Sequence, residues 1–338
     1  MTFQELARMT LAERSDYIVT AATKLGISEL IVEKDLWVVW ILERLFALSP
    51  QLGPFTFKGG TSLSKGFDAI QRFSEDVDIS ISRAAFGFPD DAYFYSAGSG
   101  KETRRRVDEI REAVRAYTSE TLLPALGRLV SAELGDDWDL DVDETGGLRF
   151  QYPTQQRGEI GYVRPDVVIE FGHADAWPAR DIDIQPYVVD AIGAVTGRVK
   201  VHVLDPRRTF WEKATILHEI AHRDETIAFP ARYSRHYYDL AVLSRTDIGD
   251  AALRDVDLLA AVVRFKDVFF HSGRARYDLA KPGTLRLMFP EYRREAVAAD
   301  YQDMQPMFFG DILPFDEVCQ RIMELEGHVN RLAQGPLS

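Results

Sequence analysis

This sequence has a single cysteine, Cys319, among its 338 residues. An intrachain disulfide is therefore excluded, and so is a zinc site built from several cysteines. No apolar run approaches the roughly 20 residues that a bilayer-spanning helix needs. The first residues mix charges with apolar side chains and lack the apolar core of a signal peptide. These absences predict a cytoplasmic globular protein without a membrane partner.

Positive charge is also scarce. Lys and Arg number 40 against 53 Asp and Glu, which gives a formal net charge of −13. Proteins that coat nucleic acid without sequence preference are usually basic, because phosphate neutralisation supplies most of their affinity. The charge balance argues against such a coat, although a local basic patch for a defined RNA or nucleotide stays open.

The spacing of apolar residues divides the chain into a mixed core with helical ends. The strand candidates are 54–58, 76–82, a hairpin over 138–152, 163–172 and 199–205. Helical spacing covers 11–48, where Ser49-Pro50 is expected to stop the helix, and then 61–70, 101–132 and most of the chain after Pro206. We therefore predict an α/β fold with an N-terminal helical segment (1–50), a mixed core (51–205) and a helical C-terminal domain (206–338).

The segment FKGGTSLSKGFDAIQRFSEDVDISIS, residues 57–82, contains the first candidate site. In DVDISIS apolar and polar residues alternate strictly, so Asp76 and Asp78 share one face of a strand. Two neighbouring carboxylates repel each other, and a divalent cation is the usual compensation. Mg²⁺ prefers one or two carboxylates together with phosphate oxygens. The pair is thus a candidate Mg²⁺ site, with an ordinary solvent-exposed strand face as the alternative.

The turn before this strand offers a candidate phosphate site. Gly59, Gly60, Thr61 and Ser62 open a helix, where backbone N–H groups can approach a phosphate closely and the helix N-terminus adds positive potential. The hydroxyl of Thr61 or Ser62 could bind the phosphate or cap the helix. A plain turn with a cap is the alternative. Together with the carboxylates, the turn suits a metal–triphosphate.

A second metal needs a further carboxylate. Glu170 interrupts the apolar run DVVIEFG and is the candidate for it, while Asp166 on the same face is weaker because it adjoins Pro165. A salt bridge from Glu170 to an arginine is the alternative.

Two helical segments supply a second cluster. Lys213 lies among apolar residues in TFWEKATILHE and could contact triphosphate oxygens or extend along the surface. In YSRHYYDLAVL, Arg235, His236 and Asp239 lie near one helix face. Asp239 could orient Lys213, bind metal or pair with Arg235.

The runs FKGGTSL, RFSEDVDIS, RTFWEKATILHE and RHYYDLAVL, with VEKDLWVVWIL upstream, resemble the AbiEii/AbiGii nucleotidyltransferase toxins of type IV toxin–antitoxin and abortive-infection systems. The similarity extends over about residues 30–245. It implies a polymerase-β-like nucleotidyltransferase core with a mixed sheet, plus N-terminal helices and a helical C-terminal domain.

The resemblance also implies an activity and roles for individual residues. It implies nucleotide transfer from an NTP with Mg²⁺ or Mn²⁺, in some relatives to the 3′ end of tRNA, and a cognate antitoxin as a candidate partner. The matched residues are the glycine-turn motif Gly59, Gly60, Thr61 and Ser62, the metal carboxylates Asp76 and Asp78, the third acid Glu170, the lysine Lys213 and the last acid Asp239.

Three other interpretations remain open from the sequence. A non-catalytic nucleotide- or protein-binding module would use the carboxylates structurally. A metal-dependent phosphodiesterase would use them for hydrolysis. The run HEIAH contains the H-E-x-x-H order of zinc proteases, with His218 and His222 as ligands and Glu219 as base, although we expect these histidines to be structural.

Basic residues near aromatic ones suggest where an RNA acceptor could bind. The candidates are Lys101, Arg104, Arg105 and Arg106, then Arg207 and Arg208, and then Arg264, Lys266, Arg274 and Arg276 beside Phe265, Phe269 and Phe270. Acidic residues are interspersed in the first group, so a solvated helix face is the expected reading there.

Overall fold

The structure is a computed structural model that describes residues 1–88, 92–155, 163–173 and 178–334. The chain forms two compact units. The sheet unit comprises Met1–Phe67 and Phe73–Leu204, and the helical unit comprises Asp68–Arg72 and Asp205–Ser338. The N-terminal helices thus lie in the same compact unit as the sheet. The predicted domain boundaries after residues 50 and 205 stay predictions. Each unit is described by itself.

The sheet unit combines one mixed sheet with helices. Its strands are β1 (Phe55–Lys58), β2 (Val77–Ile81), β3 (Asp139–Val142), β4 (Leu148–Gln151), β5 (Val167–Gly172), β6 (Ala179–Ile184) and β7 (Val199–Leu204). Its helices are α1 (Phe3–Ala7), α2 (Leu11–Leu25), α3 (Glu29–Leu52), α4 (Gly59–Phe67), α5 (Ala92–Tyr95), α6 (Gly100–Tyr117), α7 (Leu123–Ser131) and α8 (Tyr187–Ala191), with a π-helical turn over Thr118–Leu122 and a 3₁₀ turn over Arg83–Phe86.

The strand order among the described residues is β3-β4-β5-β2-β1-β7-β6. Strand β2 runs parallel to β5, and β1 runs parallel to β7, whereas the other neighbouring pairs are antiparallel. The predicted α/β class with a mixed sheet, N-terminal helices and a helical C-terminal part is confirmed. Helix α4 follows β1 directly and precedes β2 in the chain, so the glycine turn lies at the end of β1, and Asp76 and Asp78 lie at the start of the neighbouring strand β2.

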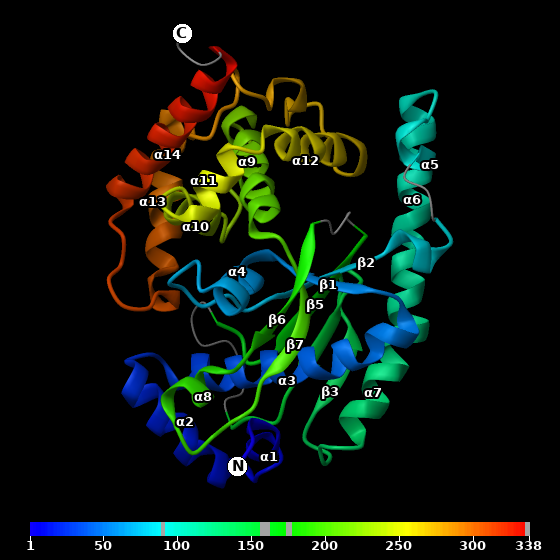
Figure 1. The fold of residues 1–338 in the computed structure, drawn as a ribbon, viewed down its shortest axis with the longest axis vertical. Helices are drawn as coiled ribbons and strands as arrows, with labels where there is room; N and C mark the ends of the chain where they lie inside the picture. Colours follow the sequence, from blue (N-terminus) through cyan, green and yellow to red (C-terminus); the bar gives the residue numbers. More distant parts are fainter. Residues whose placement is uncertain (89–91, 156–162, 174–177, 335–338) are drawn as a thin grey trace. The chain divides into compact units, whose positions relative to one another are not determined.

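Helix α3 covers one face of the sheet (Figure 1). Its fully buried Trp37 and Trp40 stack on Tyr152 and Phe150, with ring centroids 5.5 and 5.8 Å apart. The apolar residues of β2 (Val77, Ile79 and Ile81) belong to the same core. Because side chains alternate along a strand, Asp78 lies on the opposite face. Burial of the apolar face therefore fixes the direction of the carboxylate.

Three details differ from the sequence-based expectation. Helix α3 continues past Pro50 and ends at Leu52, because a proline in the last turn removes only one N–H and Gly53 (φ 98°) provides the exit. Strand β6 was not expected, since it is an edge strand with three charged residues in ARDIDI and a weak alternation. The helix expected over 101–132 is interrupted by the π-helical turn.

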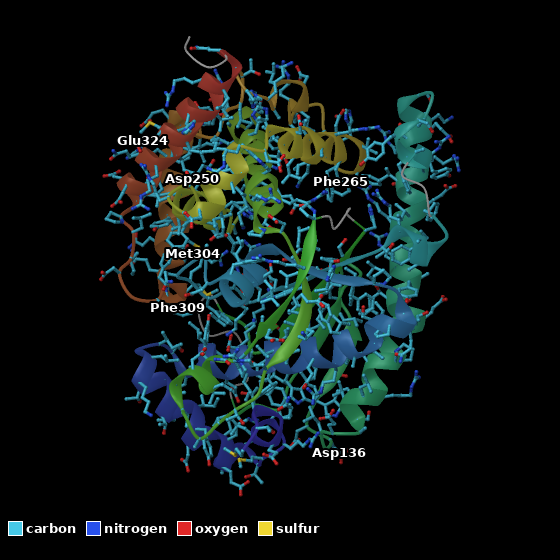
Figure 2. The ribbon with its side chains drawn as sticks, in the orientation of Figure 1. Asp136, Asp250, Phe265, Met304, Phe309 and Glu324 are labelled. Atoms are coloured by element: carbon cyan, nitrogen blue, oxygen red, sulfur yellow. The ribbon has the colours of Figure 1, made fainter. Side chains whose placement is uncertain are left out.

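The helical unit is built around α9 (Pro206–His222), which contacts three helices: α10 (Ser234–Leu243), α11 (Asp247–Leu253) and α12 (Val256–Phe269). Helices α13 (Arg294–Asp303) and α14 (Phe315–Arg331) pack on α10. Short 3₁₀ turns cover Tyr277–Leu279, Glu291–Arg293, Gln305–Met307 and Leu332–Gln334. Figure 2 labels Phe265 on α12 and Glu324 on α14. Among the residues that the structure describes, no helix is long and apolar enough to cross a membrane.

The start of α9 follows directly from its sequence. Asp205 is the N-cap and accepts a hydrogen bond from the backbone N–H of Arg207 at 2.9 Å, and Pro206 occupies the first helical position, where its missing N–H costs nothing. From this fixed start, helical spacing turns Lys213 inward, so that the residue is buried. The cap thus sets which residues of α9 are buried.

Candidate active site

Three charged side chains form a row across neighbouring strands of the sheet unit. Asp78 of β2 pairs in register with Lys58 of β1 on one side and with Glu170 of β5 on the other. Paired residues on adjacent strands place their side chains on the same face, about 5 Å apart. The Nζ atom of Lys58 lies 3.7 Å from Oδ1 of Asp78. The structure therefore brings Asp78 and Glu170 together.

Asp76 is fixed just before β2 by the glycine turn. The hydroxyl of Thr61 donates a hydrogen bond to the backbone carbonyl of Asp76, and the hydroxyl of Ser62 donates to the carbonyl of Gly59 at 2.9 Å. Both hydroxyl side chains are buried, with exposures of 1% and 0%. In this conformation both hydroxyls donate hydrogen bonds to backbone carbonyls and so stabilise the turn. A phosphate role for this turn stays a prediction, and in this conformation it would rest on the backbone N–H groups at the start of the helix.

Gly59 gives Asp78 the space that it occupies. Its φ of +79° lies in the region that favours glycine, and a Cβ atom at this position would lie 2.0 Å from Oδ2 of Asp78. The carboxylate of Asp78 therefore lies between the ammonium of Lys58 and the bare backbone of Gly59. A larger residue at position 59 would displace the carboxylate.

Two buried ion pairs connect α3 to both ends of this site, and the sequence analysis did not find them. Lys34 contacts Glu75, the neighbour of Asp76, at 2.7 Å. Asp35 contacts Lys65 of α4 at 2.6 Å and also accepts a hydrogen bond from the backbone N–H of Tyr187. All four side chains are at most 5% exposed. Such pairs fix geometry, because removing one partner leaves an uncompensated buried charge.

The residues on this face fit a divalent cation. Asp76, Asp78 and Glu170 are oxygen donors, of which Asp76 and Asp78 are partly exposed and Glu170 is exposed. Within the row of Lys58, Asp78 and Glu170, two carboxylates accompany one ammonium, so these three side chains together carry a negative surplus. Hard divalent cations such as Mg²⁺ bind oxygen donors of this kind. Among the described residues, no group of three or more His, Cys, Asp or Glu side chains is arranged so that it could hold a metal ion.

A second ion cluster lies inside the helical unit, around Asp239 of α10. Arg72 binds it with two parallel hydrogen bonds, Nε to Oδ1 and Nη2 to Oδ2, both 2.7 Å long. Lys213 of α9 lies 2.7 Å from Oδ2. The exposures of the side chains are 3% for Arg72, 6% for Lys213 and 0% for Asp239. Asp239 is therefore paired with both Lys213 and Arg72, and its role toward Lys213 stays a prediction.

The electrostatics of this cluster follow from its burial. Burial alone would raise the pKa of Asp239, but Arg72 and Lys213 hold it well below the usual range. Burial lowers the pKa of Lys213, while the charge of Asp239 opposes that shift. Burial and the neighbouring cations also push the pKa of His236 well below its ordinary value, so His236 is neutral. One carboxylate between two cations leaves a positive surplus that suits an anion.

The structure corrects the zinc-protease interpretation of HEIAH. The Nδ1 atom of His218 accepts a hydrogen bond from the backbone N–H of Arg286 at 3.0 Å, so Nε2 carries the proton and donates to the carbonyl of Arg276 at 3.0 Å. Both ring nitrogens are thus occupied, and neither can bind zinc. Glu219 pairs with Arg223 at 2.6 Å. The histidines are structural, as we expected.

The predicted basic clusters differ in how they are paired. Arg105 pairs with Glu102 and Glu109, and Arg106 pairs with Glu102, so this part of α6 is a solvated helix face with internal ion pairs. At the end of α12, the ammonium of Lys266 lies 4.9 Å from the ring centre of Phe270, which is 52% exposed. A cation above an exposed aromatic ring is the arrangement that an unpaired base can stack on.

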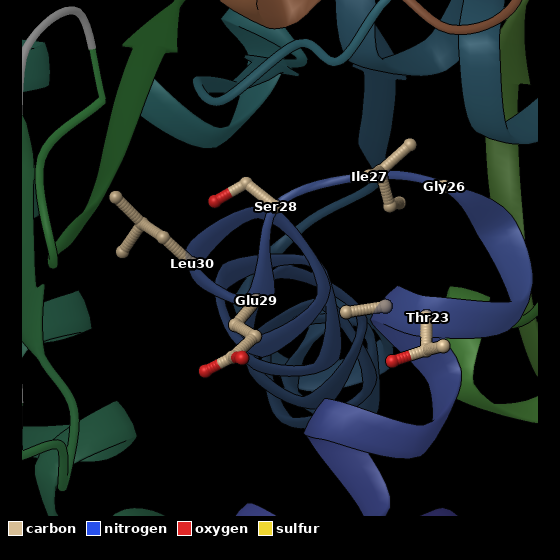
Figure 3. Close-up of a pocket in the computed structure, with 7 residues that line it drawn as sticks. Thr23, Gly26, Ile27, Ser28, Glu29 and Leu30 are labelled. Carbon is tan, nitrogen blue, oxygen red and sulfur yellow. The ribbon is translucent and has the colours of Figure 1, made fainter.

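A separate hollow of about 460 Å³ lies at the turn between α2 and α3 (Figure 3). It is lined by Ala22, Thr23, Gly26, Ile27, Ser28, Glu29 and Leu30. None of these is a candidate site residue, and Glu29 is the one charged side chain among them. The hollow is not part of the site described above.

With this geometry in place, comparison with known proteins defines the class. Residues 40–321 match the family described as nucleotidyl transferase AbiEii toxin, type IV toxin–antitoxin system. The chain belongs to this family and is a nucleotidyltransferase toxin. Family membership sets aside the non-catalytic module and the phosphodiesterase as alternatives.

The solved structures similar to this chain include that of MenT4, nucleotidyltransferase toxin Rv2826c from Mycobacterium tuberculosis H37Rv. The identity is 19%, the TM-score is 0.45, and the alignment covers 93% of this chain and 98% of that chain. No curated protein matches the sequence.

Sequence reasoning missed Lys58 and Arg72 in these two clusters and Lys34 in the buried pair with Glu75, and the signals for them differ. Lys58 directly precedes the glycine turn, and its strand position could have placed it beside Asp78. Arg72 belongs to RFSEDVDIS, but its partner Asp239 lies 167 positions away. Lys34 is part of VEKDLWVVWIL, where a lysine on an otherwise apolar helix face was a visible signal of a buried partner.

Proposed function

We propose that this toxin transfers a nucleoside monophosphate from an NTP to an RNA 3′ end in a reaction that depends on Mg²⁺. One observation carries the proposal: Asp78 and Glu170 lie in register on adjacent strands, beside Asp76 and the glycine turn. Carboxylates on one sheet face next to an anion-binding turn are what a metal–triphosphate requires. Mn²⁺ would suit the same oxygen donors.

Each residue of the sheet unit has a role in this proposal. The metal is proposed to bind Asp76 and Asp78 and, when bound, to neutralise charge on the leaving pyrophosphate. The backbone of Gly59, Gly60, Thr61 and Ser62 holds phosphate oxygens. A hydroxyl of the acceptor attacks the α-phosphorus, the bond to the bridging oxygen of the β-phosphate breaks, and pyrophosphate leaves. Glu170 is proposed to hold a second metal, which when bound would make the attacking hydroxyl more acidic, and the proton of that hydroxyl leaves to water.

Lys213 and Asp239 are proposed to act as a pair. Lys213 supplies a positive charge for phosphate oxygens, and Asp239 keeps its ammonium in one orientation. Lysine contributes a point charge with three donors, of which one is taken by Asp239. The roles of both residues are a proposal from the resemblance of the motifs, supported by the positive surplus of the buried cluster.

The proposal also names an acceptor for the nucleotide and a protein partner for the toxin. A tRNA 3′ end is the proposed acceptor, supported by the resemblance described above and by the exposed Phe270 beside Lys266. Membership of a toxin–antitoxin family supports a cognate antitoxin as the partner that controls the toxin.

The experiment is an incubation with each labelled NTP, total tRNA and Mg²⁺ or Mn²⁺. Wild-type protein is expected to transfer label to RNA, and Asp78→Asn is expected to reduce the rate by about a thousandfold or more, because it removes a metal ligand. Asp141→Asn is the matched control, since Asp139 and Asp141 form another D-x-D on an exposed strand, β3. Its rate is expected to equal wild type.

The possible outcomes separate the parts of the proposal. Absence of label on any acceptor with every NTP would contradict the transfer reaction. Equal rates for Asp78→Asn and wild type would contradict the metal site alone. Label on protein or on a small molecule, but not on RNA, would show that the acceptor is not RNA.

A further inference from the structure

Lys58 occupies a position that the proposed reaction does not yet use. It is the last residue of β1 and directly precedes the glycine turn, and it pairs in register with Asp78. Its ammonium lies 3.7 Å from Oδ1 of Asp78, and the side chains are 22% and 25% exposed. A contact of this length is an ion pair without a tight hydrogen bond. Lys58 is therefore held near the carboxylate by charge.

The stem of Lys58 extends toward the strand that carries Glu170. Its Cε atom lies 3.9 Å from the position that a Cβ would have at Gly172 of β5. Gly172 pairs with Ser80, and Glu170 pairs with Asp78, so the lysine crosses β2 between these two register positions. The ammonium thus lies on the carboxylate face between Asp78 and β5.

A cation in this place has two opposite effects on metal binding. It stabilises neighbouring carboxylates that would otherwise repel each other, so that the site can form without metal. It also repels a divalent cation that approaches the same oxygens. When a triphosphate arrives with the metal, its oxygens offer the ammonium a new anionic partner.

We infer that Lys58 is a built-in counter-charge of the metal site and that it moves from Asp78 to a phosphate oxygen when metal and nucleotide bind together. This inference rests on the proposed function, since it requires metal at Asp76 and Asp78. It makes the site bind free metal weakly and metal–nucleotide well. The lysine thereby couples the two binding events, without forming or breaking a covalent bond.

The test uses Lys58→Met, which keeps the length of the side chain and removes the charge. The affinity of the nucleotide-free protein for Mn²⁺ is measured by electron paramagnetic resonance, and the KM for the NTP is measured separately. We expect the Mn²⁺ affinity to increase by about tenfold and the KM to increase by about tenfold, opposite effects of one substitution. A residue with a purely structural role would weaken both.

Two matched variants control for charge and folding. Lys58→Arg keeps the positive charge, so its Mn²⁺ affinity is expected to equal wild type. Lys200→Met removes one positive charge from an exposed position of β7 in the same sheet and is expected to change neither quantity. Thermal unfolding of each variant shows that the sheet unit is intact.

The outcomes distinguish this inference from the proposed function. If Asp78→Asn abolishes Mn²⁺ binding while Lys58→Met binds Mn²⁺ no more tightly than wild type, the inference on Lys58 is wrong and the metal site stands. If Asp78→Asn binds Mn²⁺ as wild type does, both are overturned.

Discussion

The two ion clusters of this protein differ in burial, spacing and sign. In the sheet unit, the row combines the two carboxylates of Asp78 and Glu170 with the ammonium of Lys58, the contact of Lys58 with Asp78 is 3.7 Å long, and these two side chains are about a quarter exposed. In the helical unit, one carboxylate binds two cations through contacts of 2.7 Å, and the side chains are at most 6% exposed. The first has a surplus of negative charge, the second of positive charge.

This difference indicates what each cluster can do. Partly exposed charges in a loose pair are screened by water and change partners at little cost. Buried charges in a bidentate pair cannot change partners at little cost, because separating them leaves each charge without a countercharge. The row on the sheet is thus suited to exchange ligands, and the cluster around Asp239 is suited to hold its members in one arrangement.

The largest effect is expected from Asp239→Asn, which breaks the buried cluster. Arg72 and Lys213 would remain buried without a countercharge, and the free energy of unfolding should fall by about 3–5 kcal/mol. Urea denaturation measures the change. The control is Asp278→Asn, which removes an exposed partner of Arg276 in the same unit and should cost no more than about 1 kcal/mol. Equal losses would contradict the contrast between buried and exposed pairs.

An intermediate effect is expected from Gly59→Ala in the sheet unit. The added Cβ would lie 2.0 Å from Oδ2 of Asp78 and displace the carboxylate, so the transfer rate should fall by about 10- to 100-fold. Gly87→Ala is the matched control, because Gly87 has nearly the same φ, +80°, with open space around the missing Cβ. Both variants carry the same backbone strain. A rate for Gly59→Ala as high as that of Gly87→Ala would show that Asp78 tolerates the shift.

The smallest effect is a pH dependence of the helical unit. Burial lowers the pKa of both His218 and His236 in the folded protein. As the pH falls below about 6.5, the unfolded chain binds protons that the folded chain does not, so stability falls by up to about 1.4 kcal/mol per pH unit for each histidine. Urea denaturation at pH 7.5 and 5.5 should show this loss, and His236→Phe should reduce it. Equal losses in variant and wild type would contradict the contribution of His236.

Much of the sheet unit could be predicted because its signals are local. The alternation in DVDISIS gives β2 and the face of Asp78, and one carboxylate in an apolar run points to Glu170. The pairing of these strands adds what no local pattern contains, namely that Asp78 and Glu170 are in register and that Lys58 completes the row. Strand β6 escaped prediction because an exposed edge strand does not need an apolar face.

The helical unit was predictable in its helices but not in its ion cluster. Helical spacing shows that Lys213 faces apolar neighbours, which is equally consistent with a lysine that extends along the surface. Only the fold shows that Lys213 contacts Asp239 and that Asp239 also binds Arg72. In the same way, the order H-E-x-x-H is a statement about spacing, whereas the backbone groups that occupy both nitrogens of His218 come from segments about 60 residues later.

The short segment Asp68–Arg72 belongs to the helical unit, although α4 before it and β2 after it belong to the sheet unit. The polypeptide therefore passes from one unit to the other three times. Truncation after Leu204 would separate Arg72 from Asp239, and expression of the remainder alone would lack the guanidinium. A nick, a gene split or a domain exchange at a single point cannot yield two complete halves, so the two units must be inherited as one piece.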